Sequence, residues 1–206
     1  MKNIFERIKN YYKKRSRWAV FFDVVFYTLI LLLIIPATRK HVGSFIIKST
    51  LRAPLSINAS SGERLGPSDY RWPFQTLDGT AFYLEQVRDR VVFLNFWATW
   101  CPPCIAEMPS IERLYEAFGD RVEFIMMTNE TADVVRAFMD KNGYTFPVYI
   151  QNYQAPEIFE TNSIPTTYIV DKTGNIRMKK KGAAKWDSGK IKELLEVLVA
   201  EPVQSD

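Results

Sequence analysis

Both cysteines of this chain lie in one short motif, Cys101-Pro102-Pro103-Cys104. The apolar run Val91–Phe96 precedes the motif and predicts a strand that is buried on both faces. Proline is tolerated in the first turn of a helix, where its missing N–H is not needed, so a helix is expected to begin at the motif. Unpaired N–H groups and the dipole at such a helix start favour a thiolate. Cys101 is therefore the predicted nucleophile, and Cys104, one turn on, is its resolving partner.

Two other interpretations of a Cys-x-x-Cys pair are weaker. A zinc site needs four nitrogen or sulfur ligands in most proteins, and the chain has no further cysteine and one histidine. A purely structural disulfide between residues three apart would close a very small loop and gain little chain entropy. The motif therefore favours redox chemistry at Cys101 and Cys104.

The run FLNFWATWCPPCIAEMP, at residues 93–109, resembles the membrane-anchored thioredoxin-like oxidoreductases of the TlpA/ResA type. The resemblance includes Pro109, five residues after the second cysteine, which is expected to kink the helix. It is close over this run and looser from about residue 70 to residue 200. It implies thiol–disulfide exchange by a redox-active Cys101–Cys104 pair, and we expect neither a cofactor nor a metal.

The remaining pattern predicts an α/β domain with a mixed central sheet flanked by helices. Asp78-Gly79 between two alternating runs indicates a hairpin at the start of the domain. The resemblance identifies this architecture as a thioredoxin fold with an N-terminal β-hairpin extension, preceded by one transmembrane helix. Strands are expected at 71–77, 80–84, 91–96, 122–128, 147–150, 166–170 and 176–180. Helices are expected from the cysteine motif to residue 118, at 131–141 and at 156–160, and a last helix is expected to begin after a cap at residue 187 or 188.

Pro165 directly precedes the predicted strand 166–170. From the sequence alone a cis bond is not expected, because only ~5–6% of X–Pro bonds in folded proteins are cis. The resemblance implies the reverse, a cis Pro165 that faces the cysteines and leaves the backbone of Ile164 open to an extended substrate. Trp100, next to Cys101, is expected at the rim of a shallow substrate groove. The residues predicted to contact substrate are Trp100, Pro102, Pro103, Ile164 and Pro165.

Glu107 lies three residues after Cys104 on the same side of the predicted helix. A solvated helix glutamate is the commoner fate of such a residue. Alternatively, its carboxylate accepts the Cys104 proton as that thiol attacks a mixed disulfide. Thioredoxin has an aspartate at the position of Asn95, which cannot titrate. TlpA/ResA-type proteins combine that loss with a glutamate at the position of Glu107, which favours a catalytic role.

The N-terminus reads as a membrane anchor. Residues 1–17 form a basic arm with seven Lys or Arg against Glu6 alone, and residues 18–36 are mostly apolar with one charge at Asp23. Nineteen residues at ~1.5 Å each span ~28 Å, close to a hydrocarbon core of ~30 Å. The positive-inside rule then keeps the arm in the cytoplasm. We expect Asp23 to reach back toward the headgroups, although a functional role for this carboxylate stays open.

An uncleaved anchor is favoured over a signal peptide, because the apolar run is long and no small-x-small cleavage site follows it. Residues 37–68 are then an extracytoplasmic linker, and 69–206 are the thioredoxin-like domain. The resemblance implies a single-pass protein of the bacterial cytoplasmic (inner) membrane, with its domain on the periplasmic side.

The chain's net charge of +4 comes from its N-terminal part. Residues 1–69 hold 12 Lys and Arg against 4 Asp and Glu, whereas residues 70–206 hold 15 against 19 and carry −4. This balance disfavours nucleic acid as a partner. The basic run 177–181 is interpreted as a charged edge strand that discourages sheet-to-sheet pairing.

The predicted function is that of an extracytoplasmic thiol–disulfide oxidoreductase that reduces disulfide-bearing target proteins. Proteins similar to it act on apocytochrome c before haem attachment or on copper-site cysteines of oxidase assembly factors, and a membrane thiol donor re-reduces them. A DsbA-like oxidant is the alternative within this chemistry. A Sco-like copper chaperone fits poorly, since it needs Cys-x-x-x-Cys and a distant histidine, and His41 lies outside the domain. A peroxidase would need a further group for peroxide that the pattern does not indicate.

Overall fold

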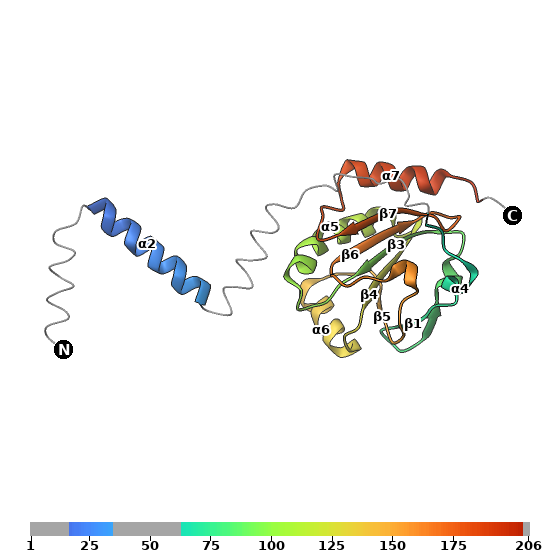
Figure 1. Cartoon of the computed structure of the whole chain (residues 1–206), viewed down its shortest axis with the longest axis horizontal. Helices are drawn as coiled ribbons and strands as arrows, with labels where there is room; N and C mark the ends of the chain where they lie inside the picture. The colour runs from blue at the N-terminus through green and yellow to red at the C-terminus, as the bar shows by residue number, and fades with distance from the viewer. Residues whose placement is uncertain (1–16, 35–62, 204–206) are drawn as a thin grey trace. The chain divides into compact units, whose positions relative to one another are not determined.

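The computed structural model describes residues 17–34 and 63–203. The chain divides into two compact units, residues 1–43 and 44–206. The first contains helix α2 (Arg17–Ile34), which falls on the predicted anchor (Figure 1). Among the helices that the structure describes, none has both the length and the apolar character needed to cross a membrane. The basic arm before residue 17 and the predicted anchor's last two residues, 35 and 36, lie outside the described residues.

The second unit is built on one mixed seven-stranded sheet with the order β2-β1-β5-β4-β3-β6-β7 (Figure 1). Strands β3, β4 and β5 run parallel, whereas the remaining neighbours are antiparallel. The predicted N-terminal hairpin is present as β1 and β2, and Gly79 in its turn has a φ of 85°. The strands are β1 (Pro73–Thr76), β2 (Ala81–Tyr83), β3 (Val91–Phe96), β4 (Val122–Thr128), β5 (Val148–Ile150), β6 (Thr166–Val170) and β7 (Ile176–Lys181).

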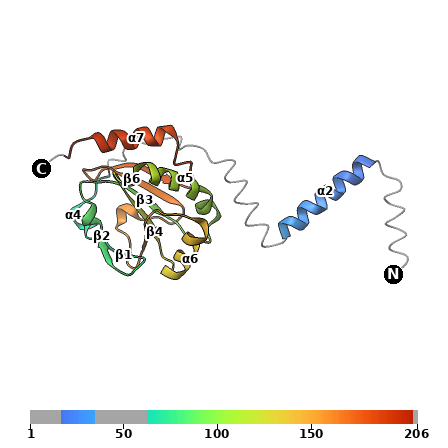
Figure 2. The ribbon, with the colours of Figure 1, turned by 180° about the vertical axis from the view of Figure 1, so that it is seen from behind.

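Three long helices pack with the sheet, and Figure 2 shows them from behind. Helix α5 follows the cysteine motif and continues through Pro109, while α6 ends at Gly143 in the left-handed conformation that favours glycine. Helix α7 has Ser188 as its N-cap, as predicted. The helices are α4 (Pro67–Tyr70), α5 (Pro102–Phe118), α6 (Ala132–Asn142) and α7 (Gly189–Ala200), with 3-10 turns η1 (Leu84–Val87) and η2 (Glu157–Phe159).

Strand β3 is the centre of the core, and all six of its residues are buried. Val91 and Phe93 face a cluster completed by apolar side chains of α5, α6 and α7. Val92, Leu94 and Phe96 face a second, more aromatic cluster that includes residues of α4, η1 and η2. Because side chains alternate along the strand, both of its faces are buried. The segment with the cysteines therefore begins directly after a rigidly packed strand.

The domain begins earlier than the predicted boundary at residue 69. The Leu65 N–H donates to the Gly174 carbonyl at 2.9 Å, and the Ile176 N–H donates to the Glu63 carbonyl at 3.0 Å. Leu65 is also buried in the aromatic cluster. Backbone pairing and one apolar side chain therefore connect residues 63–65, which are part of the predicted linker, to the β6–β7 turn. Residues 37–62 lie outside the described residues.

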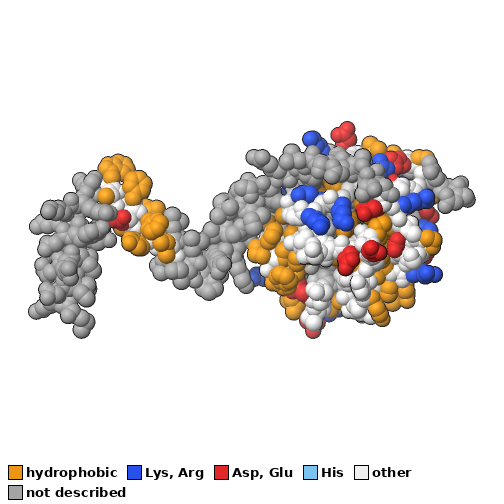
Figure 3. All heavy atoms as spheres, in the orientation of Figure 1, with side chains coloured by type: hydrophobic (Ala, Val, Ile, Leu, Met, Phe, Trp, Pro, Cys, Tyr) orange, Lys and Arg blue, Asp and Glu red, His pale blue; other side chains and the backbone are white. Residues whose placement is uncertain are grey.

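The domain surface is mixed in charge. Strand β7 lies at one edge of the sheet, as the basic run 177–181 predicted. On the face shown in Figure 3, Lys and Arg side chains lie close to Asp and Glu side chains. Acidic and basic side chains are therefore interspersed on this face.

Candidate active site

The two cysteines lie where the sequence placed them, at the junction of a buried strand and a helix. Cys101 is the N-cap of α5, and its sulfur accepts a hydrogen bond from the Cys104 N–H at 3.3 Å. The two residues form a disulfide, with their Cα atoms 5.3 Å apart. Cys101 is 3% exposed and Cys104 0%, so the expected contrast in accessibility is small in this oxidised state.

Glu107 is fully buried behind the disulfide-bearing turn of α5, which rules out the solvated-helix interpretation. Its Oε1 accepts from Asn95 Nδ2 at 2.9 Å. Its Oε2 accepts from the Ala184 N–H at 3.0 Å and from the Trp186 indole N–H at 2.9 Å. Burial raises the pKa of Glu107 from its usual 4.5 to about 7, although the three donors act in the opposite direction. The carboxyl can therefore gain or lose a proton near neutral pH.

The donors around Glu107 come from distant parts of the chain. Asn95 is on β3, and its Nδ2 also donates to Thr167 Oγ1 on β6 at 2.8 Å. Trp186 packs edge-on against Phe93, with ring centroids 5.1 Å apart, and is wholly buried. Sequence reasoning missed Ala184 and Trp186, because they lie 77 and 79 positions after Glu107 and no local pattern marks them.

The Ile164–Pro165 peptide bond is cis, as the resemblance implied. Thr166 pairs with Phe96 in the β3–β6 ladder, so this bond lies beside the segment that leads from β3 to Cys101. Pro165 is buried, and its carbonyl accepts from the Gly182 N–H at 2.8 Å. Ile164 is half-buried, and its backbone has no hydrogen-bond partner among the residues described. Its N–H and carbonyl are thus available to an extended peptide.

The other predicted substrate residues are at the surface around the motif. Trp100 is 67% exposed, Pro102 is exposed and Pro103 is half-buried. In contrast, Trp97 is buried in the core, where its ring lies 5.4 Å from that of Phe138. Trp100 therefore presents a large, mostly exposed apolar side chain directly beside Cys101.

Sequence reasoning also missed Glu130, which lies just after β4. Its carboxylate accepts from the Thr99 N–H at 2.6 Å and from the Thr99 hydroxyl at 2.7 Å. These two bonds fix the loop immediately before Cys101 to the end of the neighbouring parallel strand. Parallel strands end at one edge of a sheet, so a carboxylate after β4 could have been connected with the loop after β3.

The described part of the chain contains no group of three or more His, Cys, Asp or Glu placed to hold a metal ion. His41, which a copper site would need, lies outside the described residues. The site brings together the Cys101–Cys104 disulfide and, behind it, the buried carboxyl of Glu107.

Comparison with known proteins agrees with this geometry. A model of the AhpC/TSA family matches residues 69–179. The chain belongs to this family. It is 37% identical over 107 residues to the thioredoxin-like protein YneN of Bacillus subtilis, covering 50% of this chain and 63% of that protein. It is 34% identical over 116 residues to the thiol-disulfide oxidoreductase ResA of Halalkalibacterium halodurans, covering 55% and 66%.

The chain thus spans a little under two thirds of the length of these relatives. Among solved structures, MTB DsbF is 24% identical with a TM-score of 0.53, covering 66% of this chain and 98% of that one. This likeness confirms the thioredoxin-like α/β fold. The relatives confirm the resemblance to ResA-type proteins that the motif indicated.

Proposed function

We propose that the protein is a thiol–disulfide oxidoreductase that uses Cys101 and Cys104. The observation that carries the proposal is the disulfide at the start of α5 with the carboxyl of Glu107 buried behind it. The helix N-terminus stabilises a thiolate at Cys101 once the pair is reduced. The names of the ResA relatives support the same chemistry.

The reaction has two exchange steps. The Cys101 thiolate attacks one sulfur of a substrate disulfide, the substrate S–S bond breaks, and its other sulfur leaves with the electron pair and takes up a proton. Cys104 then gives its proton to Glu107 and attacks Cys101 Sγ, which releases the second substrate sulfur as a thiolate that is protonated in turn. The substrate has gained two electrons, and the enzyme ends with a Cys101–Cys104 disulfide.

Substrate binding is assigned to the surface around the motif. The backbone N–H and carbonyl of Ile164, which bond to none of the described residues, suit an extended chain that pairs beside the cis peptide at Pro165. Trp100, Pro102 and Pro103 would contact the side chains that flank the substrate disulfide. The substrates are thus folded or partly folded proteins with an accessible disulfide. Apocytochrome c or oxidase assembly factors as targets, and a membrane thiol donor, follow from the resemblance.

The reduction potential of the Cys101–Cys104 pair decides whether the protein reduces or oxidises its substrates. We expect the reduced full-length protein to reduce insulin disulfides, with a potential closer to the ~−270 mV of thioredoxin than to the ~−120 mV of DsbA. Equilibration with glutathione buffers, followed by alkylation and mass measurement, gives this value. A potential near that of DsbA would favour the oxidant alternative, and an absence of exchange with any disulfide would refute the proposed activity.

Membrane attachment through the N-terminus is part of the proposal. It is supported by the basic arm, by the apolar run and by the exposure of the large apolar side chains of α2, among them Trp18, Phe22 and Phe26. The domain would then act on the extracytoplasmic side. We expect the protein to stay in the membrane fraction after a high-salt wash and to keep Met1 at or near its N-terminus. A mature N-terminus at Thr38 or later would show a cleaved signal peptide instead.

A further inference from the structure

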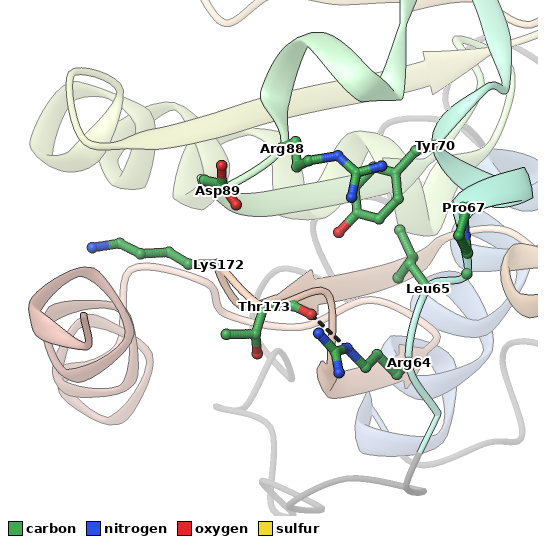
Figure 4. A pocket seen from close by; sticks show the side chains of 9 residues that line it. Arg64, Leu65, Pro67, Tyr70, Arg88, Asp89, Lys172 and Thr173 are labelled. Carbon is green, nitrogen blue, oxygen red and sulfur yellow. Dashed lines mark hydrogen bonds between the residues drawn. The ribbon is translucent and has the colours of Figure 1, made fainter. Parts of the chain in front are cut away.

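A cavity of about 440 Å³ lies in the domain, away from the cysteines. Figure 4 shows Arg88 and Tyr70 on one side of it and Arg64 and Thr173 on the other. This volume is within the range of small-ligand pockets, ~300–1,000 Å³. The cavity is lined by Arg64, Leu65, Gly66, Pro67, Tyr70, Arg88, Asp89, Lys172 and Thr173.

The cavity is at the opposite end of β3 from the proposed active site. Arg88 and Asp89 come just before the first residue of β3, whereas the cysteine motif follows the last. Six residues of strand at ~3.3 Å each separate the two ends by about 20 Å. None of the cavity's lining residues belongs to the disulfide, the Glu107 network or the Ile164–Pro165 edge. The cavity therefore has no role in the proposed exchange chemistry.

Three basic side chains from three separate segments line this cavity, against one acidic side chain, Asp89. Arg88 is paired with Glu85, so among the residues described Arg64 and Lys172 supply the unpaired positive charge of the lining against Asp89, whereas residues 70–206 together carry −4. Arg64 comes from the start of the domain, Arg88 from the turn before β3, and Lys172 from the β6–β7 turn. Such convergence concentrates positive potential in a partly enclosed space.

The two arginines keep donors that the described residues do not use. Arg64 Nε donates to the Thr173 carbonyl at 2.9 Å, and its two terminal nitrogens have no hydrogen-bond partner in the described part of the chain. Arg88 uses Nε and Nη2 for Glu85, and its guanidinium stacks 4.0 Å from the centre of the Tyr70 ring. Its Nη1 has no partner among the same residues. Both guanidinium groups are thus oriented by the protein, and each retains N–H groups for an anion.

Tyr70 adds a hydroxyl that is held in place by close packing. Burial is the main cause that raises the pKa of Tyr70, so the hydroxyl stays protonated and can donate. A Cβ atom at Gly174 would come within 2.6 Å of this hydroxyl, and Gly174 has a φ of 84°. Only glycine fits at position 174 without strain. Because glycine has no side chain, there is room for the Tyr70 hydroxyl beside it at the cavity.

We propose that this cavity binds a phosphate group, held by Arg64, Arg88 and the Tyr70 hydroxyl. Arginine and hydroxyl donors are the groups that recognise phosphate in proteins, and arginine provides bidentate geometry. Lys172 adds charge from the rim, where its ammonium also donates to the Val199 and Glu201 carbonyls at 2.6 and 2.9 Å. Phosphate can come from a free anion or from a lipid headgroup, and both present the same oxygens to these donors.

Titration calorimetry of the full-length protein in neutral detergent tests the proposal. One arm adds inorganic phosphate, and the other adds a short-chain phosphatidylglycerol. Arg64→Gln removes one charge-assisted contact, for which we expect roughly tenfold weaker binding or more. Asp89→Asn removes the opposing charge, and asparagine tolerates the left-handed backbone at this position, where φ is 67°. This variant should bind phosphate more tightly.

Arg121→Gln is the matched control, because Arg121 is another arginine of the domain, and it pairs with Glu196 and does not line the cavity. It should leave binding unchanged, and all three variants should retain disulfide exchange, since they lie outside the redox site. Binding of only inorganic phosphate identifies a free anion, and tighter binding of the lipid identifies a headgroup. Absence of binding in both arms, or equal losses in Arg64→Gln and Arg121→Gln, would overturn the proposal.

Discussion

Cys104→Ala should leave the protein covalently attached to its substrate. Cys101 retains its position at the start of α5 and still attacks a disulfide, but no thiol remains to break the mixed disulfide. Turnover should therefore stop after the first step. Incubation of the reduced variant with insulin, followed by acid quench and mass measurement under non-reducing conditions, should show one substrate chain per protein.

Cys101→Ala is the matched control, and it should form almost no adduct. Cys101 is the N-cap of α5, where unpaired backbone N–H groups favour its thiolate, whereas Cys104 lies within the helix and is wholly buried. Alkylation of the reduced wild-type protein should agree, with Cys101 labelled much faster than Cys104. If Cys101→Ala traps substrate as well as Cys104→Ala does, the assigned order of attack is wrong.

The sequence predicted the parts of this site that are continuous along the chain. Strand β3, the motif and α5 form one uninterrupted segment, and each carries its own local signal: β-branched and aromatic residues, prolines in a first turn, and apolar residues at helical spacing. The seven-stranded mixed sheet followed from the alternation of strand and helix patterns. The cis bond at Pro165 needed the resemblance, because local sequence favours trans.

The parts that sequence reasoning left open depend on contacts between distant residues. The local sequence around Glu107 is also compatible with a solvated helix residue. The contacts of its carboxylate with Ala184 and Trp186 show that it is buried, and these residues are distant in the sequence. Residues 63–65 look like linker because Gly66 and Pro67 follow them, yet their pairing partners lie in the β6–β7 turn. Helical or strand periodicity describes residues that are adjacent in the sequence, so it does not predict which distant segment packs on one face of a helix or strand.

Glu107→Gln should slow the second step of exchange and leave the first nearly intact. The first step needs only the Cys101 thiolate, whereas the second requires Cys104 to lose a proton in a buried site. A proton-transfer partner is typically worth ~10²–10⁴ in rate, and we expect the lower end because water can replace part of it. In the wild type, the rate of resolution should rise with pH through the Glu107 pKa of about 7, since only the ionised carboxyl accepts a proton.

Stability gives a second readout of the same carboxyl. The pKa of Glu107 is raised in the folded protein, so below pH 4.5 the carboxyl is neutral in both the folded and the unfolded state and does not change the free energy of unfolding. Above pH 4.5 the carboxyl ionises more readily in the unfolded chain, which favours unfolding. The free energy of unfolding should therefore fall as pH rises from 4.5 through about 7, by at most ~3 kcal/mol at ~1.4 kcal/mol per pKa unit. Glutamine cannot ionise, so urea unfolding of Glu107→Gln should lose this decline.

Both readouts can be compared with Glu116→Gln, which changes an exposed glutamate on the same helix. Each variant is reacted with a model disulfide and quenched in acid at successive times. The amount of mixed disulfide trapped at Cys101 is then measured. Accumulation in Glu107→Gln alone, with a flattened pH profile between pH 6 and 8, identifies Glu107 as the proton acceptor. If the two variants behave alike in rate but differ in unfolding, the carboxyl is a buried structural group and water takes the Cys104 proton.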